Sequence, residues 1–251
     1  MKHIIPDYTF PADPHKVAEN ADFSALESHY ADKVIRYGDF HAHSASGGTS
    51  DGKTTPAEWL AAMEELHMDF IGLMDHRQVR HMYLDEFTPE HFLYGTEPAM
   101  LWNDPYDACH YLMIFQNLGD LEVILEKFPE VFDYEGGVEG HFVYKRIDFA
   151  KFLEIGKAVR AIGGAFVNAH PKQQIKSDNI DHHDFGDRTA IETIYACEYK
   201  DVLNPHTIEN YKLWLQMLDA DKRIYATATA DAHGAPTNAG ISAMYTFDPI
   251  C

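Results

Sequence analysis

The chain has 251 residues, 45% of them hydrophobic, and its 40 acidic against 20 basic residues give a formal net charge of −20. This length fits one large α/β domain, and the hydrophobic share is enough for a substantial core, which excludes a disordered chain. The charge argues against a protein that binds long nucleic acids, because phosphate contacts need clustered Lys and Arg.

The N-terminal segment, residues 1–36, is polar, and we interpret it as an extension with a short helix around Val17–Tyr30. Its first residues lack the apolar run of a signal peptide, and no stretch of the chain approaches the roughly 18 apolar residues of a membrane span. The three cysteines include no C-x-x-C pair and fit reduced thiols. We therefore expect a cytoplasmic protein with no membrane partner, and the sequence leaves its oligomeric state open.

Residues 37–251 are predicted to form one domain in which strands and helices alternate. Apolar runs of strand length occur at Val34–Phe40, Phe70–Met74, Phe92–Tyr94, Tyr111–Phe115, Ala165–Asn168, Ile191–Ala196 and Ile224–Ala230. Helical patterns occur at Pro56–His67, Leu121–Phe128, Asp148–Ile162 and Thr207–Leu218. Polar stretches at 129–147 and 171–188 are predicted to be long loops. Strands that alternate with helices are typical of a parallel sheet, and the length fits a single barrel.

Two of these helices have clear end signals. Thr54 and Thr55 precede Pro56, and a hydroxyl before a proline in the first turn is typical of a helix start. Gly163 and Gly164 follow the helix predicted at Asp148–Ile162, and glycine is the usual residue just beyond a helix end.

The 16 histidines are the most informative feature of the composition, because histidine is the commonest metal ligand. His41 and His43 follow the first predicted strand at positions i and i+2, which point to the same face of an extended segment. Similar residues stand at or just past other strand ends: His76, Glu97, His170, Asp231 and His233. His110 fits less neatly, because it opens its strand.

In a parallel barrel the C-terminal strand ends meet at one rim, where active sites lie. Separate strands that deliver histidine and carboxylate groups to this rim would build a multinuclear metal site. Nitrogen and oxygen ligands without a thiolate suit zinc, manganese or iron.

The ordered motif set resembles the PHP (polymerase and histidinol phosphatase) family of metal-dependent phosphoesterases. The motifs are HAHS (41–44), SDG (50–52), DHR (75–77), GTE (95–97), His110, NAHP (168–171) and DAH (231–233). The resemblance spans residues 37 to 233 and implies a distorted (β/α)7 TIM-like barrel of PHP type with a trinuclear metal site.

The resemblance also implies a set of ligands for three divalent ions. The ligands of one metal match His41, His43, Glu97 and Asp231, and those of a second match Asp51, His76 and His233. Glu97 would bridge to a third metal, which His110 and His170 complete. The segment between His43 and Asp51 is longer than the commonest family spacing.

By this resemblance we expect hydrolysis of a small phosphate monoester by a hydroxide that bridges metal ions. Asp231 or His233 could assist proton transfer. Arg77 and Lys172 follow metal-binding motifs and could hold the phosphate, with Arg77 also acting in catalysis, although each could instead pair with a surface carboxylate. Three divalent ions would offset part of the negative charge where the phosphate binds.

Two alternatives remain open. The chain could be a metallo-barrel hydrolase of a non-phosphate ester, lactone or amide, because fold and metals do not separate these reactions. It could also be a catalytically silent, metal-binding accessory domain.

Overall fold

The computed structural model describes residues 24, 28, 31, 36–102, 108–131, 135–138, 141–143, 146–194, 205–235 and 244–246. The helix expected around Val17–Tyr30 therefore lies almost wholly outside the described residues. The same holds for the ends of two expected strands, at 34–35 and 195–196.

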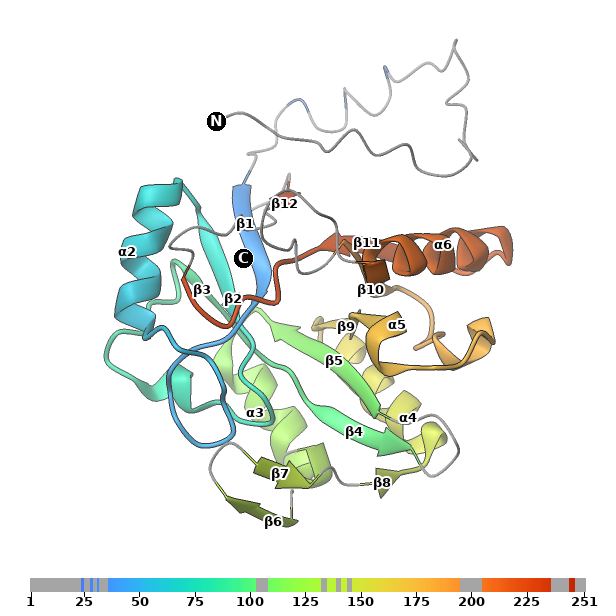
Figure 1. Cartoon of the computed structure of the whole chain (residues 1–251), viewed down its shortest axis with the longest axis horizontal. Helices are drawn as coiled ribbons and strands as arrows, with labels where there is room; N and C mark the ends of the chain where they lie inside the picture. The colour runs from blue at the N-terminus through green and yellow to red at the C-terminus, as the bar shows by residue number, and fades with distance from the viewer. Residues whose placement is uncertain are drawn as a thin grey trace.

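A curled sheet forms the centre of the molecule (Figure 1). Its strands are β1 (Arg36–Ala42), β2 (Phe70–Leu73), β3 (Phe92–Thr96), β4 (Ala99–Trp102), β5 (Ala108–Phe115), β8 (Arg146–Ile147), β9 (Ala165–Ala169), β10 (Thr189–Ile194), β11 (Ile224–Ala228) and β12 (Met244–Thr246). The main path runs in the order β11-β10-β9-β5-β3-β2-β1-β12, and β4 and β8 lie beside it. All the strands expected from apolar runs are present in this sheet, with ends shifted by a few residues.

Helices cover the outside of the sheet. They are α2 (Pro56–Leu66), α3 (Leu118–Lys127), α4 (Phe149–Ala161), α5 (Pro171–Gln174) and α6 (Pro205–Asp219), with 3-10 turns η1 (Arg80–Tyr83), η2 (Pro129–Val131) and η3 (Ile180–His182). Gly163 has the left-handed φ of 87° that ends a helix, and its N–H donates to Arg160 O at 3.1 Å, as its position after α4 predicts. None of the helices in the described ranges is long and apolar enough to cross a bilayer.

The sheet departs from an all-parallel barrel at β5. The ladders β1–β2, β2–β3, β9–β10 and β10–β11 are parallel, but β5 is antiparallel to both β3 and β9. Only residues 97–107 separate β3 from β5, and they contain β4, so no crossover helix fits between them. The chain therefore returns in the opposite direction.

The sheet is a curled half-barrel rather than a closed cylinder. At the open side, the segment that follows β11 meets the end of β1 through an isolated parallel bridge between Ala232 and Ala42, with His43 N donating to Ala232 O at 2.8 Å. This architecture is mixed α/β and compatible with a TIM-like fold. A regular (β/α)7 repeat is not observed, because β5 reverses direction and β12 pairs antiparallel with β1.

The expectation of a structureless loop over 129–147 was wrong in part. This stretch contains η2, a hairpin of β6 (Glu135–Val138) and β7 (His141–Val143), and β8, which pairs with β4. Its strands are only two to four residues long, and β6 contains two glycines, so they carry too few alternating apolar residues to be seen in the sequence. The expected loop 171–188 holds only α5 and η3 as regular structure among its residues.

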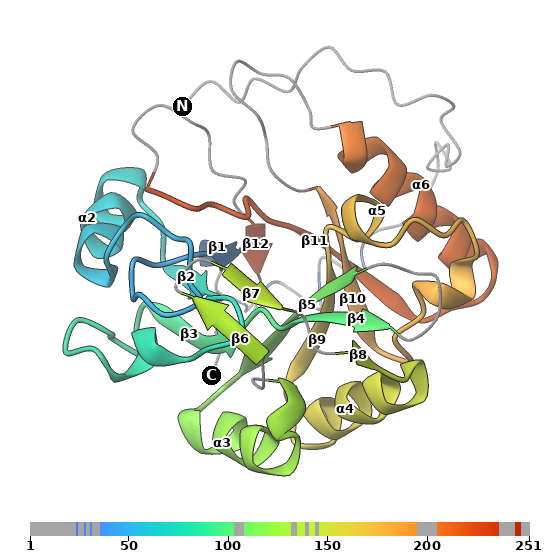
Figure 2. The same cartoon turned by 60° about the horizontal axis from the view of Figure 1, so that its bottom comes forward.

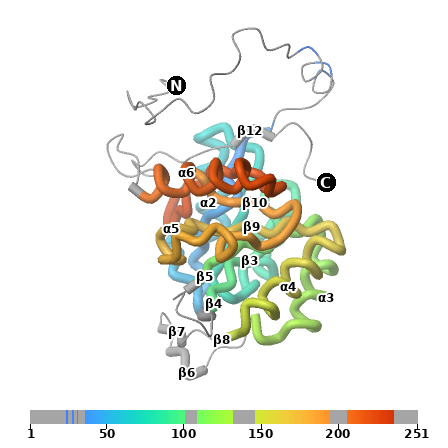
Figure 3. Tube along the Cα trace, turned by 90° about the vertical axis from the view of Figure 1, so that its right-hand side faces the viewer, coloured from blue at the N-terminus to red at the C-terminus, as the bar shows by residue number. Residues whose placement is uncertain are grey.

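Apolar side chains fill both faces of the sheet. Inside the curl, Phe70, Met74 and Leu112 form a cluster with residues of β3 and β9. Outside it, α3 and α4 pack on the sheet through a cluster that includes Phe152 and Phe166. Figure 2 shows α2, α3, α4 and α6 around the outside of the strands, and Figure 3 shows α6 on one side and α3 with α4 on another. The packed interior supports the rim at which the parallel strands end.

The start of α2 allows a test of helix capping in this fold. Thr55 is its N-cap: Thr55 Oγ1 accepts from Glu58 N at 3.3 Å, and Thr55 N donates to Glu58 Oε2 at 2.8 Å. We expect Thr55→Ala to lower the free energy of unfolding by about 1 kcal/mol, because the substitution removes the hydroxyl that accepts from Glu58 N while the backbone N–H of residue 55 remains. Urea denaturation measures the change. Glu65→Ala, on the exposed face of the same helix, is the control, and an equal loss in both variants would contradict the capping role.

Candidate metal centre

The predicted ligands gather at one rim of the sheet although they are far apart in the sequence. His41 and His43 come from the end of β1, His76 follows β2, Glu97 follows β3, and His170 follows β9. Asp231 and His233 follow β11, and Asp51 lies between β1 and α2. The sheet topology therefore brings the predicted histidine and carboxylate ligands together at one rim.

The reversal of β5 explains the position of His110. His110 stands near the start of its strand, but an antiparallel strand begins at the rim where its parallel neighbours end. His110 pairs in register with Ala169, the last residue of β9, and with Ala99 of β4. Its side chain reaches the same rim, with Nδ1 lying 3.0 Å from Glu97 Oε1.

A first group consists of His41, His43, Glu97 and Asp231. His41 Nε2 lies 3.3 Å from both Glu97 Oε2 and Asp231 Oδ1. His43 Nε2 lies 3.4 Å from the same Glu97 oxygen and 3.1 Å from the same Asp231 oxygen. Ligands held at about 2.0–2.2 Å around a tetrahedral zinc ion are about 3.3–3.6 Å apart, so these spacings fit one shared cation.

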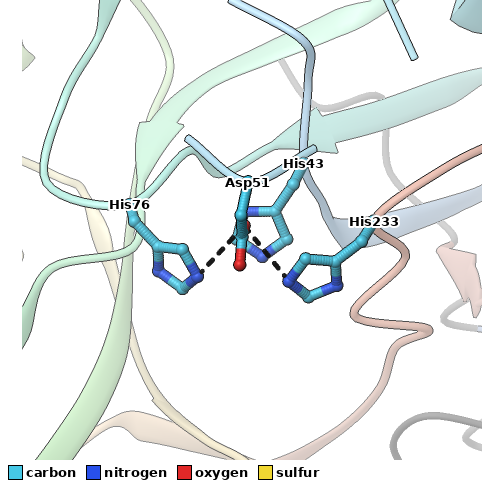
Figure 4. Close-up of side chains that lie close together, drawn as sticks. All are labelled: His43, Asp51, His76 and His233. Atoms are coloured by element: carbon cyan, nitrogen blue, oxygen red, sulfur yellow. Dashed lines mark ion pairs between the residues drawn. The ribbon is translucent and has the colours of Figure 1, made fainter. Parts of the chain in front are cut away.

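A second group consists of His43, Asp51, His76 and His233 (Figure 4). Asp51 Oδ1 lies 3.5 Å from His76 Nε2 and 3.3 Å from His233 Nε2. The side chains of Asp51 and His233 are 50% and 37% exposed, whereas those of His41, His43 and Glu97 are fully buried. The centre is therefore open to solvent on the side of the second group.

A third group surrounds Glu97. His110 Nδ1 and His170 Nε2 each lie 3.0 Å from Glu97 Oε1, and His76 Nδ1 lies 2.9 Å from Glu97 Oε2. His76 thus stands between the second and third groups, with one ring nitrogen toward each. Glu97 contacts histidines from four different strand ends and is the geometric centre of the arrangement.

The long segment between His43 and Asp51 folds back onto the strand end that carries His76. Buried Asp75 accepts hydrogen bonds from Ser44 N at 2.6 Å, from Ser44 Oγ at 2.7 Å and from Ser46 Oγ. Gly47 and Gly48 both adopt left-handed φ values, 76° and 65°, which permit the tight reversal. The extra length therefore does not keep Asp51 from the other residues of the second group.

Burial and mutual charge govern ionisation in this centre. Burial alone would raise the pKa of Glu97, but the neighbouring His76, His41 and His110 hold that pKa well below its usual value. Burial would likewise lower the pKa of His76, but attraction to Glu97 and Asp51 raises it to about 9. Burial and repulsion by His76 lower the pKa of His43 to about 4. The centre thus retains buried carboxylates that need nearby positive charge.

The donor atoms present fit divalent cations. His41 Nε2 is buried and makes no hydrogen bond with any described residue, although it points into the first group, 3.3 Å from Glu97 Oε2. A buried polar atom without a hydrogen bond is costly, and a cation bound in the first group would remove that cost. Imidazole nitrogens with carboxylate oxygens are typical ligands of zinc, manganese and iron.

The two predicted phosphate-binding residues have other contacts. Arg77 is 1% exposed, and its Nη1 donates to Ala99 O at 3.3 Å. Lys172 Nζ lies 2.9 Å from Asp178 Oδ1 and 3.1 Å from Ser177 O. The Lys172 contact is a pairing with a surface carboxylate, so the roles of both residues in substrate binding remain predictions.

A buried carboxylate that the motifs did not single out also lies beside the centre. Glu192, in the middle of β10, is fully buried, and its Oε1 lies 2.8 Å from His41 Nδ1. A charged residue inside the otherwise apolar or hydroxyl-bearing strand TAIETI was the available signal. Buried Asp39 is similar, because it accepts from the backbone N–H groups of His41 and Ala230 at 2.9 Å each.

Comparisons with solved structures identify similar folds. An amidohydrolase from Chromobacterium violaceum, with bound sulfate and no metal, shares 17% identity over 85% of this chain and 93% of its own, with a TM-score of 0.54. A lesion-specific endonuclease from Pyrococcus furiosus shares 15% identity over 80% of this chain and 49% of its own, with a TM-score of 0.52. A two-domain protein from Bacteroides vulgatus that contains a predicted PHP-like metal-dependent phosphoesterase shares 16% identity over 86% of this chain and 59% of its own, with a TM-score of 0.47.

No protein-family model and no curated protein sequence matches the chain. Because an endonuclease is among the similar folds, these comparisons do not support the expected exclusion of long nucleic acids as partners. These similarities show a related fold, and the histidine–carboxylate groups at the rim could hold metal ions. A PHP-like metal-dependent phosphoesterase domain is among the folds that the chain resembles, at low sequence identity.

Proposed function

We propose that the chain is a metal-dependent phosphoesterase that hydrolyses a small phosphate monoester. The observation that carries this proposal is the convergence of His41, His76 and His170 on the single carboxylate Glu97. Residues from separate strand ends that meet on one buried carboxylate are expected for a multinuclear metal centre. We further propose a cytoplasmic location and a division into an extension, residues 1–36, and one catalytic domain, residues 37–251.

The three groups provide ligands for three divalent ions, which we propose to be zinc, manganese or iron. The proposed ligands are His41, His43, Asp51, His76, Glu97, His110, His170, Asp231 and His233. Such ions, when bound, lower the pKa of a coordinated water and neutralise phosphoryl oxygens. The spacing within the first group and the bridging position of Glu97 support this assignment.

The distribution of exposure indicates how a substrate would approach. His41, His43 and Glu97 are shielded from water, and Asp51 and His233 are in contact with it. We propose that the phosphate enters on the side of the second group. His233 Nδ1 lies 2.9 Å from Asp231 O, a contact that directs Nε2 toward that open side. We therefore propose that His233 binds its metal through Nε2, and that Asp231 assists proton transfer at the leaving group through Oδ2, the oxygen that His41 and His43 do not face.

Of the two predicted phosphate-binding residues, Lys172 has the contact that is easier to exchange. Its partner Asp178 is 99% exposed, and a surface ion pair of this kind is worth at most about 1 kcal/mol. Lys172 can therefore exchange Asp178 for a phosphate at little cost. Arg77 is enclosed beside Ala99, two residues after Glu97, and its proposed contribution is to hold that backbone.

The proposal is tested by a hydrolysis screen of the protein loaded with zinc or manganese. The panel contains sugar phosphates, nucleotides, bisphosphates and histidinol phosphate, with a damaged DNA duplex, an amide and a lactone as competing classes. We expect phosphate release from at least one small monoester. His41→Ala should lower that rate more than about 100-fold and reduce the bound metal, because His41 contributes to the first group.

His206→Ala is the matched control, because His206 is a half-exposed histidine that pairs with Glu209 on α6, outside the centre. This variant should retain wild-type activity and metal content. Metal-loaded wild-type protein that releases no phosphate from any monoester would contradict the proposed function. Cleavage of only the DNA, the amide or the lactone would replace it by the corresponding alternative.

Metal binding should also release protons. In the absence of metal the pKa of His76 is raised to about 9 and that of His41 is raised well above its usual value. Both rings are therefore protonated at both nitrogens, and positively charged, at pH 7. A cation must displace those protons, and the apparent metal affinity should rise with pH up to about 9, by as much as about tenfold per pH unit for each displaced proton.

Calorimetric titration with zinc in buffers of different ionisation enthalpy counts the protons released. We expect a buffer-dependent heat at pH 7 that declines as the pH approaches 9. His206→Ala should show the same proton count as the wild type. A binding heat that is independent of the buffer would show that the ligands are already deprotonated, against this expectation.

A further inference from the structure

Glu192 contacts two of the proposed ligands at the same time. It lies at the centre of β10, next to β9 in the parallel ladder, and its side chain is fully buried. One carboxylate oxygen, Oε1, lies 2.8 Å from His41 Nδ1. The other, Oε2, accepts the backbone N–H of His170 at 2.7 Å. Both oxygens are therefore engaged, and each holds a residue from a different strand end.

The contact with His41 fixes which ring nitrogen carries the proton. An ionised carboxylate can only accept hydrogen bonds, so His41 Nδ1 must be the donor. When the protonated His41 ring gives up a proton on binding a metal, that proton therefore leaves from Nε2, which lies 3.3 Å from both Glu97 Oε2 and Asp231 Oδ1, and the neutral Nδ1–H form remains. This is the tautomer that a metal ligand needs at Nε2.

The contact with His170 stabilises an unusual backbone conformation. His170 has φ 29° and ψ 58°, near the left-handed region, which residues other than glycine rarely adopt. Its N–H points at Glu192 Oε2 rather than into the strand ladder. This turn of the backbone places His170 Nε2 3.0 Å from Glu97 Oε1.

We propose that Glu192 is a positioning residue that orients His41 in the first group and His170 in the third group together, and so couples occupancy of two metal positions. This inference rests on the proposed metal-dependent function and extends it to a residue outside the ligand set. Its consequence is that loss of both Glu192 oxygens weakens two metal positions at once, whereas Glu192→Gln disturbs the His41 contact and keeps the one with His170, although Glu192 itself need bind no metal.

Glu192→Gln separates this role from simple packing. Glutamine has nearly the same shape, and its amide oxygen can still accept from His170 N–H, but its NH2 group then faces His41 Nδ1. His41 must accept at Nδ1 and carry its proton on Nε2, which blocks the atom that faces Glu97 and Asp231. We expect a folded variant whose zinc affinity is lowered about 10–100-fold.

The experiment uses the full chain and two measurements that do not depend on turnover. Competition with a chromophoric chelator gives the zinc affinity and stoichiometry. Nitrogen-15 NMR of the metal-free protein, at a pH high enough to remove the second proton from His41, gives the histidine tautomers. We expect the Nδ1–H form of His41 in the wild type and the Nε2–H form in Glu192→Gln. Glu209→Gln, which removes a carboxylate from a half-exposed histidine on α6, is the control and should leave both measurements unchanged.

Unchanged zinc affinity in folded Glu192→Gln would overturn the proposal. If this variant fails to fold, the wild-type spectrum still decides, because an Nε2–H tautomer of His41 would overturn it. Failure of the proposed function has a different signature. Wild-type protein that binds zinc but releases no phosphate would contradict the phosphoesterase, while the effect of Glu192→Gln on zinc binding would still stand.

Discussion

The structure depends on a concentration of buried negative charge at one rim of the sheet. Glu97 and Glu192 are fully buried, and the side chain of Asp231 is nearly so. All three carboxylates lie within 3.3 Å of the ring of His41. Carboxylates removed from water are costly unless positive charge lies beside them. Protonated imidazoles can supply it in the metal-free protein, and divalent cations can supply more of it at the same positions. The arrangement of histidines around these carboxylates follows from this requirement.

The half-barrel makes the arrangement possible. Parallel strands β1, β2, β9, β10 and β11 end at the same rim, and the packed apolar interior beneath them fixes where each end lies. The sequence carried much of this information, because a period-two pair such as His41 and His43 must share a face. Their rings lie 5.1 Å apart between centroids. Apolar runs and helix end signals likewise located the main elements, since burial and capping act locally.

The features that could not be predicted from the sequence depend on contacts between segments that are far apart in the chain. The direction of β5 follows from a connection too short for a helix, and only that reversal explains why His110 reaches the rim from the start of its strand. Glu192 carries no motif, and its role appears only once β10 lies beside β9 and opposite His41. The burial of Arg77 beside Ala99 also results from tertiary packing, which the residues next to Arg77 in the sequence do not reveal.

We propose that Glu97 joins the histidine groups into one multinuclear metal centre. Elemental analysis of Glu97→Gln after loading with zinc, beside wild type and Glu154→Gln on the surface of α4, tests it most directly. The account predicts that wild type and Glu154→Gln bind several ions per chain and that folded Glu97→Gln loses more than one of them together, because both oxygens of Glu97 face histidines. A Glu97→Gln variant that retains the wild-type number of ions would contradict it.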